Sequence, residues 1–156
     1  MGLDMYLSKK TYVKQWEHIP KEEQFEVTVQ RNGEVYDKIK PERVSYVTEE
    51  VMYWRKSNQI HDWFVKNCQN NVDDCGEYYV GADDLKKLYQ MCKEVMEFNP
   101  EKHPQDILPT TPGFFFGSTE YDEWYYNDIK ATIEFLEGEM NPDGSFDTNY
   151  YYQSSW

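Results

Sequence analysis

The stretch TEEVMYWRKSNQIHDWFVKN, residues 48–67, decides what the middle of the chain builds. Thr48 and the two glutamates after it are typical of a helix start, because threonine caps free N–H groups and acids suit the positive end of the helix dipole. We therefore expect a helix from Thr48 to about Asn67. At helical spacing, one inward stripe of this helix carries Val51, Trp54, Asn58, His61, Val65 and Cys68.

Two side chains on that stripe, Asn58 and His61, are polar. Buried polar groups need hydrogen-bond partners. One interpretation is that both side chains bond to neighbouring backbone inside the core. The other interpretation is that they line one end of a pocket, with Arg55 or Lys56 at its rim. The sequence leaves both interpretations open.

A second informative stretch, TTPGFFFGSTEYDEW, spans residues 110–124. Phe114 to Phe116 is expected to form a short strand between two glycines, and alternation turns the middle ring to the opposite face. Thr119 then begins a helix through a capping-box pattern, and this helix runs to about Glu139. The first N–H groups of such a helix are free to bind an anion.

Asp122 has two expected roles near the start of that helix. Its carboxylate is suited to capping free N–H groups. It also continues the inward stripe, because it lies four residues before Tyr126. If the two helices pack on one face of the sheet, Asp122 and His61 face a shared hollow.

The remaining elements define the fold class. Asn32-Gly33 supplies the positive φ angles of a tight hairpin turn between alternating stretches at 25–29 and 35–39. Residues 83–98 have the apolar spacing of a helix. Short strands are expected at 1–7, at 77–80 and in the aromatic tail at 149–156. These elements predict an α+β fold, a single domain over residues 1–156, with about three helices packed on a small, mostly antiparallel sheet.

The charge of the chain is distributed unevenly. The net charge is −13, and residues 68–156 hold 5 basic and 18 acidic side chains, which accounts for all of it (5 − 18 = −13). A phosphate backbone would be repelled by that part, so we expect no direct nucleic-acid binding. No apolar run reaches the length of a membrane span. Three cysteines without a secretory signal indicate reduced thiols in a cytoplasmic protein.

Five stretches together carry a resemblance: MGLDMYL (1–7), YWRKSNQIHDWFV (53–65), DDCGEYYV (73–80), LPTTPGFFFGSTEYDEWYYNDI (108–129) and YYYQSSW (150–156). The chain resembles a family of small uncharacterised proteins encoded by phages and prophages, which begin in the same way and end in a similar aromatic tail. The resemblance spans nearly the whole chain. It implies an accessory protein of a mobile element that works in the cytoplasm of a bacterial host.

The first functional hypothesis is a non-enzymatic protein that binds a small nucleotide-like ligand. Aromatic rings would stack on a flat base, polar side chains would read its edge, and a cation would hold a phosphate. In a mobile element, sequestering an immune signal of the host is a fitting anti-defence role. The predicted ligand-binding residues are Trp54, Arg55, Asn58, His61, Phe115, Ser118, Thr119, Tyr121, Asp122 and Tyr125.

Two alternatives belong to other classes. The first is an acidic protein that imitates DNA and inhibits a basic host protein, based on the acids near one face of the third helix. Those acids are Glu120, Glu123, Glu134 and Glu137. The second alternative is a small hydrolase or transferase that uses His61 with Asp122. We expect no cofactor and no metal site, since the cysteines and histidines lack the paired close spacings of zinc ligands. The oligomeric state, a homo-oligomer included, stays open.

Overall fold

The computed structural model describes residues 2–156 and confirms the predicted α+β class. By its internal contacts the chain divides into two compact units. The larger unit comprises residues 2–8 and 50–156, and the smaller unit comprises residues 9–49. No helix in the described part combines the length and the apolar character that crossing a membrane requires.

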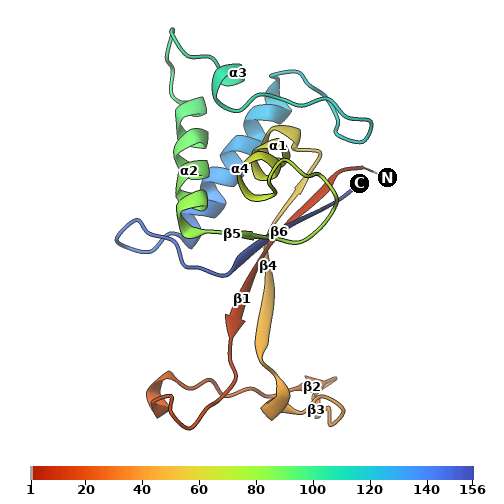
Figure 1. The fold of residues 1–156 in the computed structure, drawn as a ribbon, viewed down its shortest axis with the longest axis vertical. Coiled ribbons are helices and arrows are strands. Elements are labelled where there is room, and N and C mark those ends of the chain that lie inside the picture. Colours follow the sequence, from red (N-terminus) through yellow and green to blue (C-terminus); the bar gives the residue numbers. More distant parts are fainter. Residues whose placement is uncertain (1) are drawn as a thin grey trace. The chain divides into compact units, whose positions relative to one another are not determined.

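A four-stranded sheet has the strand order β4-β1-β6-β5 (Figure 1). Its strands are β1 (Asp4–Tyr12), β4 (Tyr46–Arg55), β5 (Tyr78–Val80) and β6 (Tyr150–Ser155). Strand β5 pairs with β6 in antiparallel register, with Val80 opposite Tyr150. Alternate residues of β6 are buried, as a strand with one face on the core requires. The predicted strand in the aromatic tail is confirmed.

The larger unit contains the helices α1 (Asn58–Cys68), α2 (Ala82–Met96), α3 (Pro104–Ile107) and α4 (Glu123–Glu139). Helix α2 packs beside α4 (Figure 1), and the helix predicted at 83–98 is confirmed with nearly the same bounds. The core between helices and sheet is rich in large side chains because burying apolar area is the main favourable term in folding. Its fully buried members include Leu3, Met5, Leu7, Ile60, Phe64, Leu85, Ile129, Leu136, Tyr150 and Tyr152.

The expected helix start at Thr48 is wrong. Strand β4 runs through Thr48 to Arg55, and α1 begins only at Asn58. The residues from Tyr46 to Trp54 are mostly β-branched, aromatic or acidic, and pairing with β1 stabilises them as a strand. Lys56 then takes a left-handed backbone conformation, with φ of 54°, which separates the strand from the helix.

The expected strand at Phe114 to Phe116 is also wrong. These residues form a turn, in which the Phe116 N–H donates to the Gly113 carbonyl at 3.1 Å. The Phe114 side chain is 94% exposed. Helix α4 begins at Glu123 rather than at Thr119, and Asp122 is its N-cap. The Asp122 Oδ1 accepts a hydrogen bond from the Tyr125 N–H at 3.1 Å, so the predicted capping role of Asp122 is confirmed.

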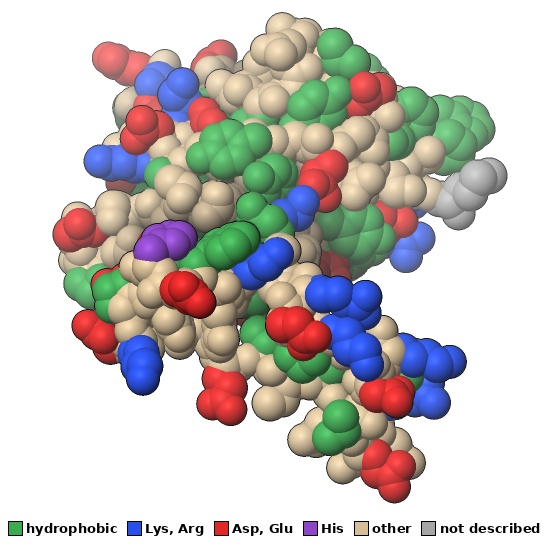
Figure 2. All heavy atoms as spheres, turned by 60° about the horizontal axis from the view of Figure 1, so that its bottom comes forward, with side chains coloured by type: hydrophobic (Ala, Val, Ile, Leu, Met, Phe, Trp, Pro, Cys, Tyr) green, Lys and Arg blue, Asp and Glu red, His purple; other side chains and the backbone are tan. Residues whose placement is uncertain are grey.

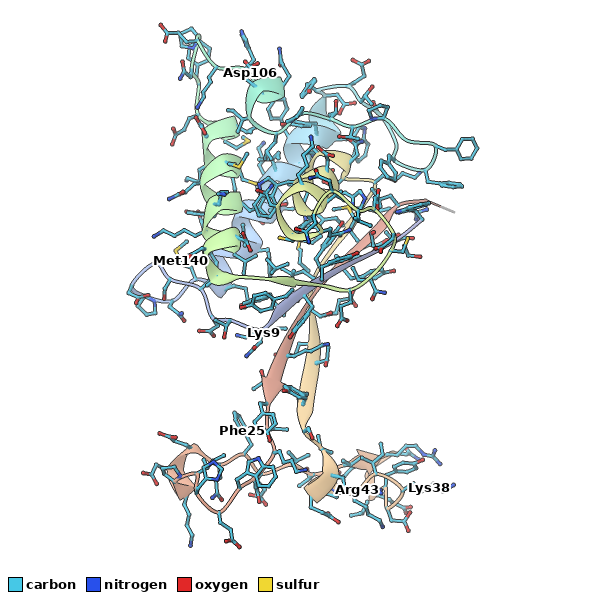
Figure 3. The ribbon with its side chains drawn as sticks, viewed as in Figure 1. Lys9, Phe25, Lys38, Arg43, Asp106 and Met140 are labelled. Atoms are coloured by element: carbon cyan, nitrogen blue, oxygen red, sulfur yellow. The ribbon has the colours of Figure 1, made fainter. Side chains whose placement is uncertain are left out.

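The smaller unit contains the predicted Asn-Gly hairpin. Asn32 and Gly33 have φ angles of 53° and 80°, and they connect β2 (Gln30–Arg31) with β3 (Glu34–Val35). The strands are shorter than expected and lie closer to the turn. Within residues 9–49 Val13 is the one buried apolar side chain. Figure 3 labels Phe25, Lys38 and Arg43 in this unit.

Candidate functional site

The His61 imidazole is buried and bonded at both nitrogens. It is 1% exposed, its Nδ1 lies 2.6 Å from the Tyr152 hydroxyl, and its Nε2 lies 3.0 Å from Asp73 Oδ2. The other oxygen of that carboxylate accepts from the Trp156 indole N–H at 3.1 Å. His61 therefore ties α1 to the C-terminal strand and to the loop after α1, and it faces no hollow.

Asn58 connects the start of α1 to the loop that precedes α4. Its amide nitrogen donates to the Phe116 and Ser118 carbonyls, each at 2.9 Å. Its amide oxygen accepts from the Thr111 N–H at 2.9 Å. Asn58 is 1% exposed, and all three of these hydrogen bonds are to backbone groups. The interpretation of Asn58 as a buried, satisfied side chain is the one that the geometry supports.

Trp54 is buried in the core, where its indole N–H donates to the Thr132 hydroxyl at 2.8 Å. Trp54, Asn58 and His61 thus hold the fold together and do not share a hollow with Asp122. The His61–Asp122 pair of the enzyme hypothesis is likewise not formed, because each side chain is engaged with other partners.

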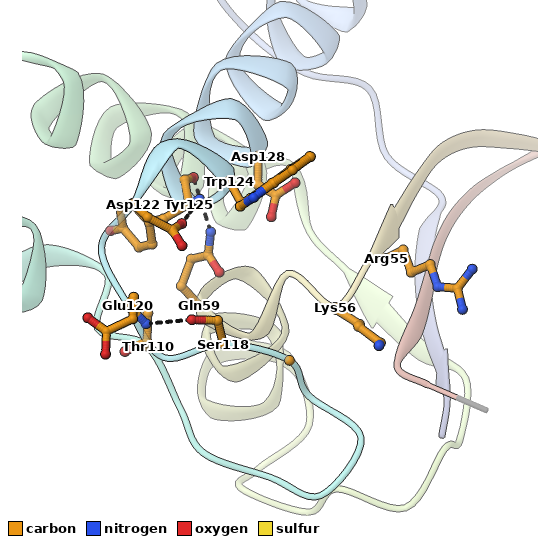
Figure 4. Close-up of a pocket in the computed structure, with 11 residues that line it drawn as sticks. Arg55, Lys56, Gln59, Thr110, Ser118, Glu120, Asp122, Trp124, Tyr125 and Asp128 are labelled. Atoms are coloured by element: carbon orange, nitrogen blue, oxygen red, sulfur yellow. Dashed lines mark hydrogen bonds between the residues drawn. The ribbon is translucent and has the colours of Figure 1, made fainter.

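A hollow of about 400 Å³ does exist in the larger unit, at the β4–α1 connection (Figure 4). The loop before α4 and the first turns of α4 complete its walls. It is lined by Arg55, Lys56, Gln59, Thr110, Gly117, Ser118, Glu120, Asp122, Trp124, Tyr125 and Asp128. Four of the predicted site residues, Arg55, Ser118, Asp122 and Tyr125, are brought together here.

The other three predicted residues, Phe115, Thr119 and Tyr121, support the walls from outside the lining. The Phe115 carbonyl accepts from the Leu3 N–H at 3.0 Å. The Thr119 carbonyl accepts from the Thr110 hydroxyl at 2.8 Å, and the Tyr121 hydroxyl accepts from the Thr110 N–H at 3.1 Å. These bonds set the course of the loop, since each anchors a backbone group at a different point.

The lining separates positive from negative charge. Arg55 and Lys56 come from the β4–α1 connection, whereas Glu120, Asp122 and Asp128 come from the segment before α4 and from α4 itself. Within residues 2–156 neither cation forms an ion pair. The hollow therefore offers an anionic group two cations that are not engaged in ion pairs.

Lys56 is held in a conformation that side-chain-bearing residues rarely adopt. Its φ of 54° lies in the left-handed region, which costs a residue with a Cβ about 1–2 kcal/mol. A Cβ added at Gly117, whose φ is +81°, would lie 3.1 Å from Lys56 Cβ. Lys56 therefore combines an unfavourable backbone angle with a close contact to Gly117, and its side chain lines the hollow. Strained residues of this kind cluster at functional sites.

Asp128 is the carboxyl of the hollow whose titration is most altered. Burial raises its pKa to about 6, the nearby Ser57 hydroxyl works against the rise, and the negative charge of Asp122 adds to it. The ionised form is therefore disfavoured by its surroundings and gains from any ligand group that donates hydrogen bonds.

We expect Asp128→Asn to raise the melting temperature at pH 7.5 and to lose this advantage near pH 4. The folded pKa is raised, so between about pH 4 and 6 the folded state holds a proton that the unfolded state has lost. Stability therefore falls as the pH rises through this window, and the amide variant is spared the loss. Thermal melts at both pH values measure the difference in melting temperature between the variant and the unmodified protein. Asp143→Asn is the control, because a hydrogen bond from Ser145 lowers the pKa of Asp143 instead of raising it. If Asp128→Asn changes the melting temperature by the same amount at both pH values, the raised pKa of Asp128 is contradicted.

Gln59 contributes an amide acceptor to the hollow. The side chain is 3% exposed, and its amide nitrogen approaches the Tyr125 carbonyl at 3.4 Å. In the described part of the chain no hydrogen bond reaches its Oε1, and Figure 4 shows this amide between α1 and the start of α4, with the oxygen turned toward the hollow. This oxygen has no partner among residues 2–156 and opens onto the hollow, so it is free to accept a hydrogen bond from a ligand donor placed there.

Trp124 supplies an aromatic surface at the mouth of the hollow. Its side chain is 76% exposed, so the face of the indole is open to a ligand. Trp124 and Asp128 are four residues apart on α4 and lie on the same face, and Figure 4 shows the indole beside the carboxylate. A ring stacked on this indole would present its edge to Asp128.

Sequence reasoning missed Gln59, Thr110, Trp124 and Asp128. The i, i+4 spacing of Trp124 and Asp128 was the available signal, because it places an aromatic ring and an acid on one helical face. No sequence pattern pointed to Gln59, because the inward stripe of the predicted helix contains its neighbours Asn58 and His61 but not Gln59 itself.

The acidic stripe expected on the third helix is not a uniform solvated face. Glu120 lines the hollow, and Glu137 accepts from the Tyr89 hydroxyl at 3.0 Å. On the face shown in Figure 2, acidic and basic side chains lie close to one another, and hydrophobic side chains gather in several places between them. This arrangement gives the DNA-mimic hypothesis no specific support.

Among the described residues, no group of three or more His, Cys, Asp and Glu side chains is placed to hold a metal ion. No protein-family model, curated protein or solved structure matches the chain.

Proposed function

We propose that this protein binds a small nucleotide-like ligand in the hollow at the β4–α1 connection, and that it does so without catalysing a reaction. The observation that carries the proposal is the lining itself: two unpaired cations, an exposed indole, and carboxylate and amide acceptors surround about 400 Å³. This volume lies in the range of pockets that hold small ligands.

The two cations define where an anionic group would bind. Arg55 and Lys56 lie on one wall, while the rest of the larger unit is strongly acidic. An anion is repelled by most of that surface, so these two side chains are its best position in the hollow. A phosphate suits the site because guanidinium and ammonium groups donate strong, charge-assisted hydrogen bonds.

The indole defines where a flat ring would bind. Stacking of a base on an aromatic side chain contributes about 1–3 kcal/mol. Trp124 is available for it, since most of its surface is open to solvent. A ligand with a phosphate at one wall of the hollow and a flat ring at the other is a nucleotide. We propose that the protein sequesters a nucleotide signal of the host in a phage-infected cell.

Thermal shift and calorimetric titration with a panel of nucleotides test the proposal. We expect at least one nucleotide to raise the melting temperature, because a ligand that binds only the folded state stabilises it. Trp124→Ala and Lys56→Gln should each weaken binding at least tenfold. The matched controls are Phe98→Ala, an exposed aromatic outside the hollow, and Lys93→Gln on α2.

The controls should bind as the unmodified protein does. If no nucleotide raises the melting temperature, or if the Trp124 and Lys56 variants bind as well as the controls, the proposal is overturned.

A further inference from the structure

The wall formed by α1 and α4 offers the ligand hydrogen-bond acceptors rather than donors. Gln59 Oε1 has no partner in the described chain and faces the hollow. The Asp128 carboxylate lies beside the Trp124 indole. Asp122 spends one oxygen on the Tyr125 N–H, and its carboxylate also lines the hollow. A ring that enters here must therefore bring N–H groups on its edge.

The partly enclosed position of these acceptors strengthens the requirement. Gln59 is 3% exposed, and burial raises the pKa of Asp128 to about 6. A ligand edge that carries acceptors would leave both groups unpaired and would place lone pairs against a negative charge. A ligand edge with adjacent donors would satisfy them and would stabilise the ionised carboxylate.

Nucleobases differ at this edge. Guanine presents a ring N–H next to an exocyclic amine, which matches the two oxygens of a carboxylate in a fork. Hypoxanthine keeps the ring N–H and lacks the amine. Adenine presents a ring acceptor beside its amine, so only one of its two neighbouring groups can donate to a carboxylate.

We infer that the hollow selects a guanine-type base, stacked on Trp124, with its donor edge on Asp128 and Gln59 and its phosphate on Arg55 and Lys56. This inference rests on the proposed nucleotide binding and adds the identity of the base to it. The stacking and the edge contact are compatible, because Trp124 and Asp128 occupy one face of α4.

Calorimetric titration of the full chain with GMP, IMP and AMP at pH 7.5 tests the inference. A bidentate contact to a base edge is worth about 1–3 kcal/mol of discrimination, so we expect the Kd for GMP to be at least tenfold lower than that for AMP. IMP should fall between them. In Asp128→Asn the ratio between GMP and AMP should fall below about threefold, since an amide offers only one acceptor. Glu134→Gln, a change in an exposed carboxyl of α4 outside the lining, should keep the ratio.

The outcomes separate the two proposals. Equal binding of GMP and AMP, with binding still lost in Trp124→Ala, would overturn the choice of base and leave nucleotide binding intact. If Asp128→Asn still prefers GMP over AMP, the contact between the donor edge of the base and Asp128 is overturned. Failure of all three nucleotides to bind would overturn both proposals. Melting curves of each variant confirm that it is folded before its affinity is compared.

Discussion

Asn58→Ala is expected to lower the free energy of unfolding by about 3 kcal/mol. The side chain makes three hydrogen bonds to backbone groups in the loop before α4, and each is worth about 1 kcal/mol net. Alanine leaves those three groups without their partner. For a chain of this length the melting temperature should fall by roughly 10 °C.

The same substitution should also weaken ligand binding, because the Ser118 carbonyl that Asn58 holds belongs to the lining of the hollow. The matched control is Asn67→Ala, at the other end of α1. Asn67 is exposed and makes one bond, to the Trp63 carbonyl at 2.8 Å, so its loss should cost less than about 1 kcal/mol. Equal costs for the two alanine variants, measured by chemical denaturation, would show that the Asn58 bonds do not anchor the loop.

His61→Ala should destabilise the fold by about 3–4 kcal/mol. Its imidazole is 1% exposed, so removal leaves a cavity beside Phe116 and Tyr152. It also leaves the buried Tyr152 hydroxyl without the partner that lies 2.6 Å away. Both penalties act on the folded state, so they should appear as a lower denaturation midpoint.

The ligand affinity of folded His61→Ala should stay within about threefold of the unmodified protein, because His61 is not part of the lining. His18→Ala is the control for stability, since that side chain is exposed and its loss should change little. A tenfold loss of affinity in His61→Ala, at a temperature where the variant is folded, would return His61 to the binding site.

Local signals predicted the elements whose determinants lie close together in the chain. The Asn32-Gly33 turn depends on two residues that tolerate positive φ, and it forms where expected. The N-cap role of Asp122 depends on an N–H three residues away. Helix α2 depends on apolar spacing over about four turns, and its bounds agree closely with the predicted range 83–98.

The candidate site depended on contacts that no local pattern contains. Asn58 and His61 were expected to face a hollow because they interrupt an apolar stripe. Their partners lie 53 to 60 residues away for Asn58, and 91 residues away for Tyr152 beside His61. A polar side chain on an inward stripe shows that a partner must exist, but not whether that partner is backbone, another side chain or a ligand.

The sequence by itself determined the α+β class, the hairpin turn, the cap of α4 and the confinement of the negative charge to one part of the chain. Only the tertiary structure decided that residues 46–55 form a strand and that Gln59, Trp124 and Asp128 share a hollow with two cations. The reason is that propensities and caps act over a few residues, whereas strand pairing and pocket lining are set by groups far apart in the chain. At Thr48, where β4 is exposed, backbone pairing with β1 outweighs the local preference for a helix.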